Sequence, residues 1–438
     1  MNWLNFFDTK TTHRKHPFGR GTNASISPEE ENLFNKSYEA FEQKDMISAY
    51  DYFFRSLENY FDDIPNQNII TTKEDDKLLF EIYQGCAKIT GTITNEHFYA
   101  EVIMIKKKDA SVSLKRYILE RNYQLTYAYY FSDDEYIKLK LFYDNITMSP
   151  QKIFFPIREL ALNADFDKEY IKSEFPEITL EDIGHLKPVD DTELNIKYEF
   201  LHKWIDDLDT KVLTLPSNDN AGMQAFLHLN ILFQIDYLLV PKYDIYHKIS
   251  KKVQEYFGDD TATIETRNEE LKRYIYKLKD MNFEEFKSRF YNAKYTFNPT
   301  EKTSFEEITT FINESLTKIR WYKNNRYNQI IPTIYKYIAF YILYNYGLNQ
   351  VMRELLHTLV EIQNQNFFNK LEYPTLYNQE NETFAKKAII SRIEDIIEPH
   401  QARFKELEPF GEELNFSNMN EFSNSFYLQI NNLNFEDI

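Results

Sequence analysis

Residues 78–105, LLFEIYQGCAKITGTITNEHFYAEVIMI, contain three runs in which β-branched, aromatic and aliphatic residues dominate. Gly85 separates the first two runs, and Asn95-Glu96 forms a tight turn before the third. Such short connections join antiparallel strands, because a parallel pair needs a crossover of about a dozen residues or more. The stretch therefore predicts an antiparallel sheet with strands over 78–83, 87–94 and 97–105.

Two further strands complete the sheet after an intervening helix. Ser111 is placed to cap that helix, and strands are predicted over 124–131 and 137–143. In the last strand Lys138 and Lys140 alternate with apolar residues. Because successive side chains of a strand point to opposite faces, one face of this sheet is expected to contact water.

Two amphipathic helices precede the sheet. Ser27 caps the first, and Glu30 stands in the position that completes a capping box. The second helix carries a wide apolar stripe in which Phe53 and Phe54 are adjacent. One phenylalanine would fill a core on one side of the helix, so the second is available for another contact. With Leu57 on the same helix, these apolar residues are candidate contacts for a protein partner.

A last helix closes this part of the chain. Ser149-Pro150 begins it, and its inward positions follow helical spacing as far as Ala164. Pro156 falls inside that pattern. Because a proline removes a backbone hydrogen bond, it either kinks the helix or marks its true start.

The order of predicted elements over 28–172 is helices, three strands, a helix, two strands and a helix. Within it, LKRYILERNY at 114–123 and PIRELALNAD at 156–165 resemble motifs of the YbjN family, whose fold is that of type III secretion chaperones. The resemblance implies an α+β domain over 27–175, an antiparallel sheet with flanking helices, that binds a polypeptide on an apolar surface. Many domains of this fold form homodimers, so self-association is implied as well. The resemblance implies no catalytic residue.

From residue 192 onward the strand patterns almost disappear. A linker marked by one glycine and two prolines is predicted over 176–193, followed by a helical domain over 194–408 with a sub-boundary near 296–303. The sequence has no repeat of fixed period, so this part is expected to be an all-α helical bundle or an irregular helical array. A C-terminal tail over 409–438, rich in Asn and Phe, is either a strap on this domain or a partner-binding segment.

Residues 1–26 are expected to form an extended N-terminal arm. Trp3, Phe6 and Phe7 give it an apolar end, which packs either on its own domain or on another protein. Its basic residues follow the apolar ones, which is the reverse of the order in a secretory signal peptide.

The composition restricts the kinds of partner. The formal net charge of −18 opposes binding to nucleic acid and to anionic membranes, because both require a positive surface. The basic and aromatic run 320–327 is therefore interpreted as an amphipathic helix. The apolar run nearest to the roughly 18 residues of a membrane span, Thr333–Tyr346, contains Lys336, so no membrane insertion is expected. A single cysteine, Cys86, rules out an internal disulfide and suits the reducing cytoplasm.

Motifs for enzymatic chemistry are scarce. The sequence has no glycine-rich phosphate loop and no H-E-x-x-H or G-x-S-x-G motif. Two Glu-x-x-His pairs, Glu199 with His202 and Glu354 with His357, are half of the ligand set of a di-metal site in a helical bundle. However, such pairs also arise by chance, Glu199 flanks the apolar stripe of its helix, and His357 is expected to point to the far side of its own. No metal and no other cofactor are therefore expected.

These observations favour a non-enzymatic protein-binding adaptor or chaperone-like protein. Its α+β domain is expected to bind a polypeptide or a second copy of itself, and its helical part to dock to a larger assembly. A structural subunit of a multi-protein machine is the first alternative. A metal-dependent enzyme built on the helical part is the second, and the Glu-x-x-His pairs are the feature that favours it.

Overall fold

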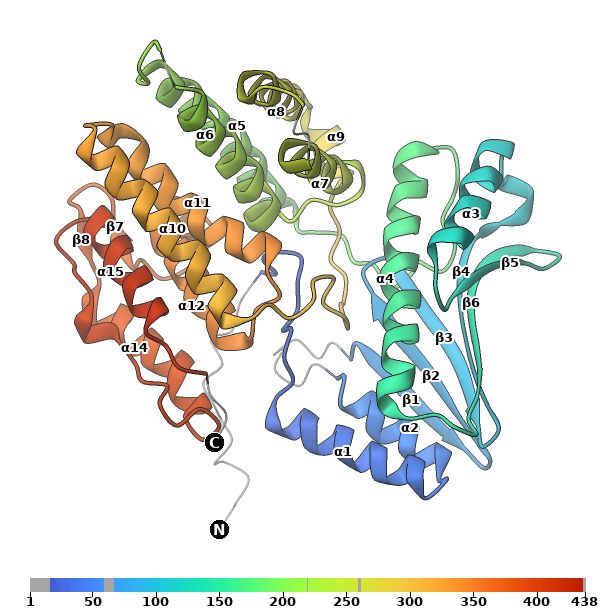
Figure 1. Cartoon of the computed structure of the whole chain (residues 1–438). Coiled ribbons are helices and arrows are strands. Elements are labelled where there is room, and N and C mark those ends of the chain that lie inside the picture. Colours follow the sequence, from blue (N-terminus) through green and yellow to red (C-terminus); the bar gives the residue numbers. More distant parts are fainter. Residues whose placement is uncertain (1–15, 59–66, 219, 259–260, 436–438) are drawn as a thin grey trace.

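The computed structural model describes residues 16–58, 67–218, 220–258 and 261–435 (Figure 1). The buried apolar side chains of these residues form two hydrophobic cores. One core lies in an α+β domain near the N-terminus, and the other lies among the helices that follow. The predicted fold class, an antiparallel sheet with flanking helices followed by an all-helical region, is confirmed.

The α+β domain is one sheet with helices packed on its inner face. In chain order its elements are α1 (Pro28–Glu42), α2 (Met46–Arg55), β1 (Ile69–Glu74), β2 (Lys77–Gln84), β3 (Ala87–Thr94), β4 (His97–Lys106), α3 (Val112–Gln124), β5 (Tyr129–Ser132), β6 (Tyr136–Asp144) and α4 (Pro150–Glu174). The strands lie in the order β1-β2-β3-β4-β6-β5, and every neighbouring pair is antiparallel. Helices α2 and α4 cover the sheet, and α4 also packs against α7 (Tyr243–Gly258) of the helical part.

The alternation of side chains along the strands explains this core. On β2, the side chains of Leu78, Phe80 and Ile82 point inward and are at most 2% exposed. Phe80 lies opposite Gly91 of β3, and a Cβ at Gly91 would come 2.2 Å from the Phe80 ring and 2.3 Å from a backbone oxygen of β4. Only glycine fits there, because the phenylalanine ring occupies the space that a side chain needs.

The helices that carry the two family-like motifs meet at one buried carboxylate. Asp167 of α4 accepts hydrogen bonds from Tyr117 Oη (2.6 Å) and Arg121 Nε (2.8 Å) of α3. Its second oxygen accepts from Tyr130 Oη on β5 (2.7 Å). Arg121 also donates to Asn163 Oδ1 (2.5 Å), so residues of both motifs are in direct contact. This network fixes α3 against α4 at the β5 edge of the sheet.

The predicted strands differ from the observed ones in two places. The sequence pattern does not predict β1, because this edge strand buries only Ile69 and lacks a regular apolar alternation. The prediction of a strand over 124–131 is wrong at its start, since α3 continues to Gln124 and β5 begins at Tyr129. Glu159 accepts hydrogen bonds from the three backbone amides that precede β5, which holds those residues in a turn.

Helix α4 is one continuous element from Pro150 to Glu174. Ser149 caps it by accepting a hydrogen bond from the Lys152 amide (3.3 Å). The helix continues through the buried Pro156, so this proline does not mark its start.

The second part consists of helices packed around one continuous core. Its elements are α5 (Asp191–Leu213), α6 (Ala221–Gln234), the π-helical turn η3 (Ile235–Leu239), α7, α8 (Ile264–Lys279), α9 (Phe283–Lys287), α10 (Phe305–Asn324), α11 (Ile331–Asn345), α12 (Gln350–Gln363), α13 (Gln365–Lys370), the short strands β7 (Tyr377–Asn378) and β8 (Thr383–Phe384), α14 (Lys386–Ile397) and α15 (Met419–Asn431). The core extends from Leu194 to Leu433 without a break at the predicted sub-boundary near 296–303. Among the described residues, no helix combines the length and the apolar character that a bilayer crossing requires.

The predicted C-terminal tail over 409–438 contributes to this core. It contains α15, whose Phe422, Phe426 and Tyr427 side chains are fully buried. Tyr427 Oη donates a hydrogen bond to the backbone oxygen of Tyr335 on α11 (2.6 Å). Of the two alternatives for the tail, its described part therefore packs on its own helical domain, because its apolar side chains complete the helical core.

Residues 16–26 of the predicted arm also belong to the helical part. Phe18 is buried in the helical core, and the Gly19 amide donates to the backbone oxygen of Tyr237 (2.9 Å). The α+β domain is thus inserted between this segment and α5. The apolar residues at the start of the arm lie outside the described residues: Trp3, Phe6 and Phe7.

Candidate functional site

The predicted partner contacts on α2 are mainly core residues. Phe53 and Phe54 have no exposed surface, and Leu57 is half-buried against the same core. Helix α2 lies between α1 on one side and the sheet and α4 on the other, so both of its flanks are covered. The two phenylalanines therefore stabilise the domain and present no surface to a partner, which corrects the sequence-based prediction.

The Glu-x-x-His pairs have other partners than a metal. Glu199 is exposed and forms an ion pair with Lys370 (3.9 Å), and His202 packs edge-on against a tyrosine of its own helix. His357 is buried instead of pointing outward, because α12 is surrounded by the core, and a hydrogen bond joins its Nδ1 to Tyr237 Oη (2.9 Å). In the part of the chain that the structure describes, no group of three or more His, Cys, Asp or Glu side chains is placed to hold a metal ion.

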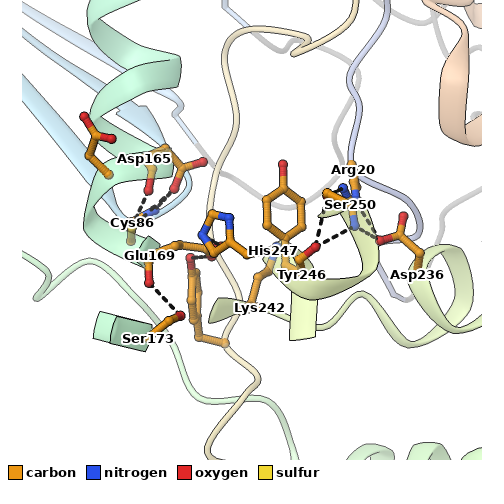
Figure 2. Close-up of polar contacts among 12 residues, drawn as sticks. Arg20, Cys86, Asp165, Glu169, Ser173, Asp236, Lys242, Tyr246, His247 and Ser250 are labelled. Carbon is orange, nitrogen blue, oxygen red and sulfur yellow. Dashed lines mark hydrogen bonds and ion pairs between the residues drawn. The ribbon is translucent and has the colours of Figure 1, made fainter. Parts of the chain in front are cut away.

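A group of buried and half-buried ionisable side chains lies where α4 packs against α7. Figure 2 shows Asp165 and Glu169, one turn apart on α4, on the side that faces the helical part. Lys242 and His247 approach them from the helical part, at the start of α7 and within it. We call these four residues and their hydrogen-bond partners the interdomain cluster.

Asp165 is held by the turn between β2 and β3. It accepts hydrogen bonds from the backbone amide of Cys86 (2.8 Å) and from its Sγ (3.3 Å). The preceding Gly85 has a φ of +54°, and a Cβ there would come 2.1 Å from the Asp165 carboxylate. Burial raises the pKa of Asp165, and it raises the pKa of the Cys86 thiol well above its ordinary value. Cys86 is therefore a protonated donor to Asp165 and a poor nucleophile.

Glu169 contacts two residues of the helical part. Its Oε1 accepts a hydrogen bond from Tyr291 Oη, and its Oε2 lies 3.7 Å from His247 Nε2. Burial, reinforced by the nearby Asp165 charge, raises the pKa of Glu169 to about 8. Burial also lowers the pKa of His247 to about 4. At neutral pH both groups are therefore mainly uncharged, and their contact is not a salt bridge.

Lys242 supplies the positive charge of the cluster. It is 7% exposed and donates a hydrogen bond to Tyr295 Oη. Its Nζ also lies 5.4 Å from the ring centroid of Tyr291 and 4.9 Å from that of Tyr295, within range of a cation–π interaction. The hydrogen bond and the two rings therefore stabilise this buried ammonium within the cluster.

A second buried ion pair continues the cluster toward the N-terminal segment. Arg20 Nε donates to Asp236 Oδ1 (2.5 Å), and its Nη1 donates to Ser250 Oγ (2.6 Å). The guanidinium lies 3.9 Å from the ring centroid of Tyr246. Figure 2 draws both residues together with Asp236 and Ser250. This pair attaches residues 16–26 to η3 and α7.

The cluster joins two parts of the chain through contacts of α4 with residues before and within α7. A cleft of about 230 Å³ lies beside it, and among its lining residues are Arg20, Tyr246 and Asn298. Neither Asp165 nor Glu169 lines that cleft. Both acids instead accept hydrogen bonds from donors of their own chain.

A different surface is accessible on the outer face of the sheet. Tyr129, Phe131 and Phe142 are each between 42% and 49% exposed, and Tyr99 beside them is half-buried. We call these four residues the aromatic patch. Register places Tyr99 of β4 opposite Phe142 of β6, so the patch continues across neighbouring strands.

Charged residues within the patch are paired with one another. Glu101 lies 3.0 Å from Lys138 Nζ and 3.7 Å from Lys140 Nζ. Lys140 Nζ also lies 4.1 Å from the ring centroid of Phe131. The sequence indicated a wet sheet face from its alternating lysines, but it did not indicate that aromatic side chains share that face.

The sequence alone did not predict the interdomain cluster. Its one visible signal is the placement of Asp165 and Glu169 next to the inward-facing Ala164 of an amphipathic helix. The chain matches no known protein-family model and no curated protein sequence.

Proposed function

We propose that this chain is a non-enzymatic, chaperone-like adaptor whose α+β domain binds an amphipathic polypeptide segment through the aromatic patch. The observation that carries the proposal is the cluster of half-exposed aromatic side chains on the uncovered face of β4, β5 and β6. Exposed aromatic groups of this kind are enriched in protein interfaces, because they bury a large area with few rotatable bonds.

The charges of the patch suit a protein partner. Lys138 pairs with both Glu101 and Asp133, and Lys140 lies close to Glu101, so a partner that covers the patch leaves no lysine of these two without an acidic neighbour. Full burial of one phenylalanine contributes about 1.5–3 kcal/mol. The three half-exposed rings together therefore contribute about 2–5 kcal/mol, which favours a transient complex after the cost of association is included.

The edge of the sheet favours binding to the face over addition of another strand. β5 has only four residues, and its Tyr130 amide donates to Asn122 Oδ1 of α3 (2.7 Å). That backbone group is no longer available to an incoming strand. A helix or turn that lays apolar side chains across the patch makes no such demand on the edge.

A non-enzymatic role is also consistent with the interdomain cluster. Its carboxyls have donors from the same chain, and the raised pKa of Cys86 opposes nucleophilic chemistry. The helical part is then the portion that connects the polypeptide-binding domain to a larger assembly.

The test is a cross-linked pull-down from the native cell with full-length chains. Tyr129→Ser/Phe131→Ser is expected to lose the proteins that the wild-type chain recovers. The matched control is Trp321→Ser, which removes an aromatic residue that is 56% exposed on α10 of the helical part. If the patch variant recovers the same proteins as the wild type, the patch is not the binding surface. A partner that stays bound at high salt in equimolar amount instead identifies a permanent structural subunit.

A further inference from the structure

Residues 292–301 connect α9 to α10, which both belong to the helical part, yet they lie against the α+β domain (Figure 1). We call this segment the cis strap. It contains no helix or strand of the described secondary structure, and Phe297 at its centre is counted in the core of the α+β domain. The domain thus already holds an extended segment of polypeptide that reaches it from another part of the chain.

The backbone of the strap is bound by the end of β2. The Gly85 amide donates to the backbone oxygen of Lys294 (2.8 Å). Gln84 is 2% exposed, and its Oε1 accepts hydrogen bonds from the consecutive amides of Thr296 (3.0 Å) and Phe297 (2.8 Å). One buried side-chain carbonyl therefore satisfies two backbone donors of the bound segment.

Two side chains of the strap enter the domain. Phe297 is 2% exposed and packs edge-to-face against Phe154 of α4, with ring centroids 5.8 Å apart. Thr296 Oγ1 donates to the backbone oxygen of Tyr83 (2.9 Å) and accepts from Asn68 Nδ2 (3.1 Å). The domain therefore offers an aromatic pocket next to a site for a hydroxyl group.

Arg158 of α4 binds the end of the strap. Its Nη2 donates to the backbone oxygens of Asn298 (3.0 Å) and Pro299 (3.3 Å), and its Nη1 donates to Glu301 Oε1 (2.6 Å). Contacts to backbone oxygens accept many sequences, whereas the pocket for Phe297 requires an aromatic residue. This combination of sequence-tolerant and sequence-selective contacts is characteristic of peptide-binding grooves.

We propose that Gln84, Asn68, Phe154 and Arg158 line a peptide-binding groove, which the strap occupies in cis and exchanges for a partner peptide with a hydroxyl residue followed by phenylalanine. The inference rests on the proposed function, since it takes the α+β domain to be a polypeptide binder. It concerns a different surface from the aromatic patch, so the two can fail independently.

Physical considerations favour exchange over simple release of the strap. An empty groove leaves the buried Gln84 carbonyl without its two donors and leaves a cavity of phenylalanine size, and both are unfavourable. Because the strap is tethered to the groove, it competes with a free peptide at an effective concentration on the order of millimolar. The apparent affinity of a free peptide is therefore reduced by the small fraction of chains in which the strap is detached. In the resting chain the strap is autoinhibitory.

The test uses full-length chains and a fluorescent peptide of residues 291–303, YNAKYTFNPTEKT. By fluorescence anisotropy, the Phe297→Ala chain is expected to bind the peptide at least tenfold more tightly than the wild-type chain. Adding Arg158→Ala to that chain, or Phe297→Ala to the peptide, is expected to reverse the gain. A Phe297→Ala chain with wild-type circular dichroism that binds no better than wild type refutes the groove.

Two further measurements keep the proposal testable if Phe297→Ala does not fold. Thr296→Val keeps the shape of the strap and removes both hydroxyl hydrogen bonds, and it is expected to raise peptide affinity by a smaller factor. In the wild-type chain, the Thr296 and Phe297 amides are expected to exchange with deuterium faster than the core amides of α4. If these amides exchange with deuterium only on global unfolding, the groove never opens in the folded chain. That result also refutes the replacement of the strap by a partner peptide.

The experiments separate this inference from the proposed function. The Tyr129→Ser/Phe131→Ser chain, combined with Phe297→Ala, is expected to keep its affinity for the strap peptide. Peptide binding without any effect of the patch on cellular partners supports the groove and rejects the patch. Loss of cellular partners from the patch variant, without any binding of the strap peptide, supports the patch and rejects the groove.

Discussion

Glu169→Gln is the substitution that best tests the physical description of the interdomain cluster. Glutamine keeps the volume of Glu169 and an oxygen that accepts from Tyr291 Oη. It removes only the ability to ionise. Because the folded chain holds the pKa of Glu169 at about 8, against an ordinary value of 4.5, the unfolded chain loses this proton first as the pH rises.

The sign and the size of the effect follow from that difference. A raised folded pKa contributes stability that is fully present below pH 4.5 and is lost as the pH rises through about 8. The interval spans about 3.5 pH units, and at about 1.4 kcal/mol per unit the upper limit is about 5 kcal/mol. Coupling to Asp165 and relaxation of the site reduce this to a few kcal/mol. The wild-type chain is therefore expected to lose stability relative to Glu169→Gln between pH 5 and 9.

Urea unfolding followed by circular dichroism at pH 5, 6, 7, 8 and 9 measures this difference. The two free energies of unfolding are expected to be closest at pH 5 and to diverge steadily, with the variant more stable at pH 9. Glu314→Gln on α10 is the matched control, because Glu314 is exposed and its substitution leaves the cluster intact. Parallel profiles for wild type and Glu169→Gln across this range would show that Glu169 titrates as a solvated acid.

Three other substitutions test neighbouring features. Arg20→Met leaves the buried Asp236 without its partner and is expected to lower the free energy of unfolding by about 3–5 kcal/mol, whereas Arg20→Met/Asp236→Leu is expected to recover most of the loss; urea unfolding of both variants decides. Gly91→Ala places a Cβ 2.2 Å from the Phe80 ring and is expected to cost about 3 kcal/mol or more, seen as a lower thermal midpoint. His247→Gln is expected to flatten the loss of stability between pH 6.5 and 4, because a His pKa lowered to about 4 gives stability that disappears as the pH falls through that window; an unchanged acid limb contradicts it.

Local patterns in the sequence predicted the local structure well. The capping box of α1 is complete, since Ser27 Oγ accepts from the Glu30 amide (3.2 Å) and the Glu30 carboxylate accepts from the Ser27 amide (2.6 Å). The alternation over 78–105 predicted β2, β3 and β4 with small errors at their ends. These features depend on residues within a few positions of one another, so a single sequence contains the information.

Burial by distant elements was the main source of error. Phe53 and Phe54 looked like excess apolar surface because the pattern of one helix does not show that α1 and the sheet cover both of its flanks. His357 looked outward because the stripe of α12 does not show that its other side also faces the core. The interdomain cluster was not predicted because its contacts join residues that are far apart in the sequence. Tyr291 and Glu169, for example, are 122 positions apart.

The boundary between the two parts is crossed more often than a single linker implies. The predicted linker does contain the turn from α4 to α5, and Leu180 within it pairs with Ile105 near the end of β4. However, Phe18 on one side of the α+β domain is in the helical core, and Phe297 from the helical part is in the core of the α+β domain. Each part therefore contains a phenylalanine that the chain supplies from beyond the predicted boundary.

Buried charges at this boundary impose a further constraint. A purely apolar contact between two domains can slide, but the ion pair of Arg20 with Asp236 is favourable only while both side chains stay in place. The arm is bound to α7 through Arg20 and Ser250, and the cis strap is bound to α4 through Arg158. A partner that displaces the strap removes Phe297 and Tyr295 from this region together, since they are two positions apart, and Lys242 then loses its bond to Tyr295. Occupancy of the proposed groove is thereby coupled to the stability of the interdomain cluster, which connects polypeptide binding on the α+β domain to the packing of the helical part.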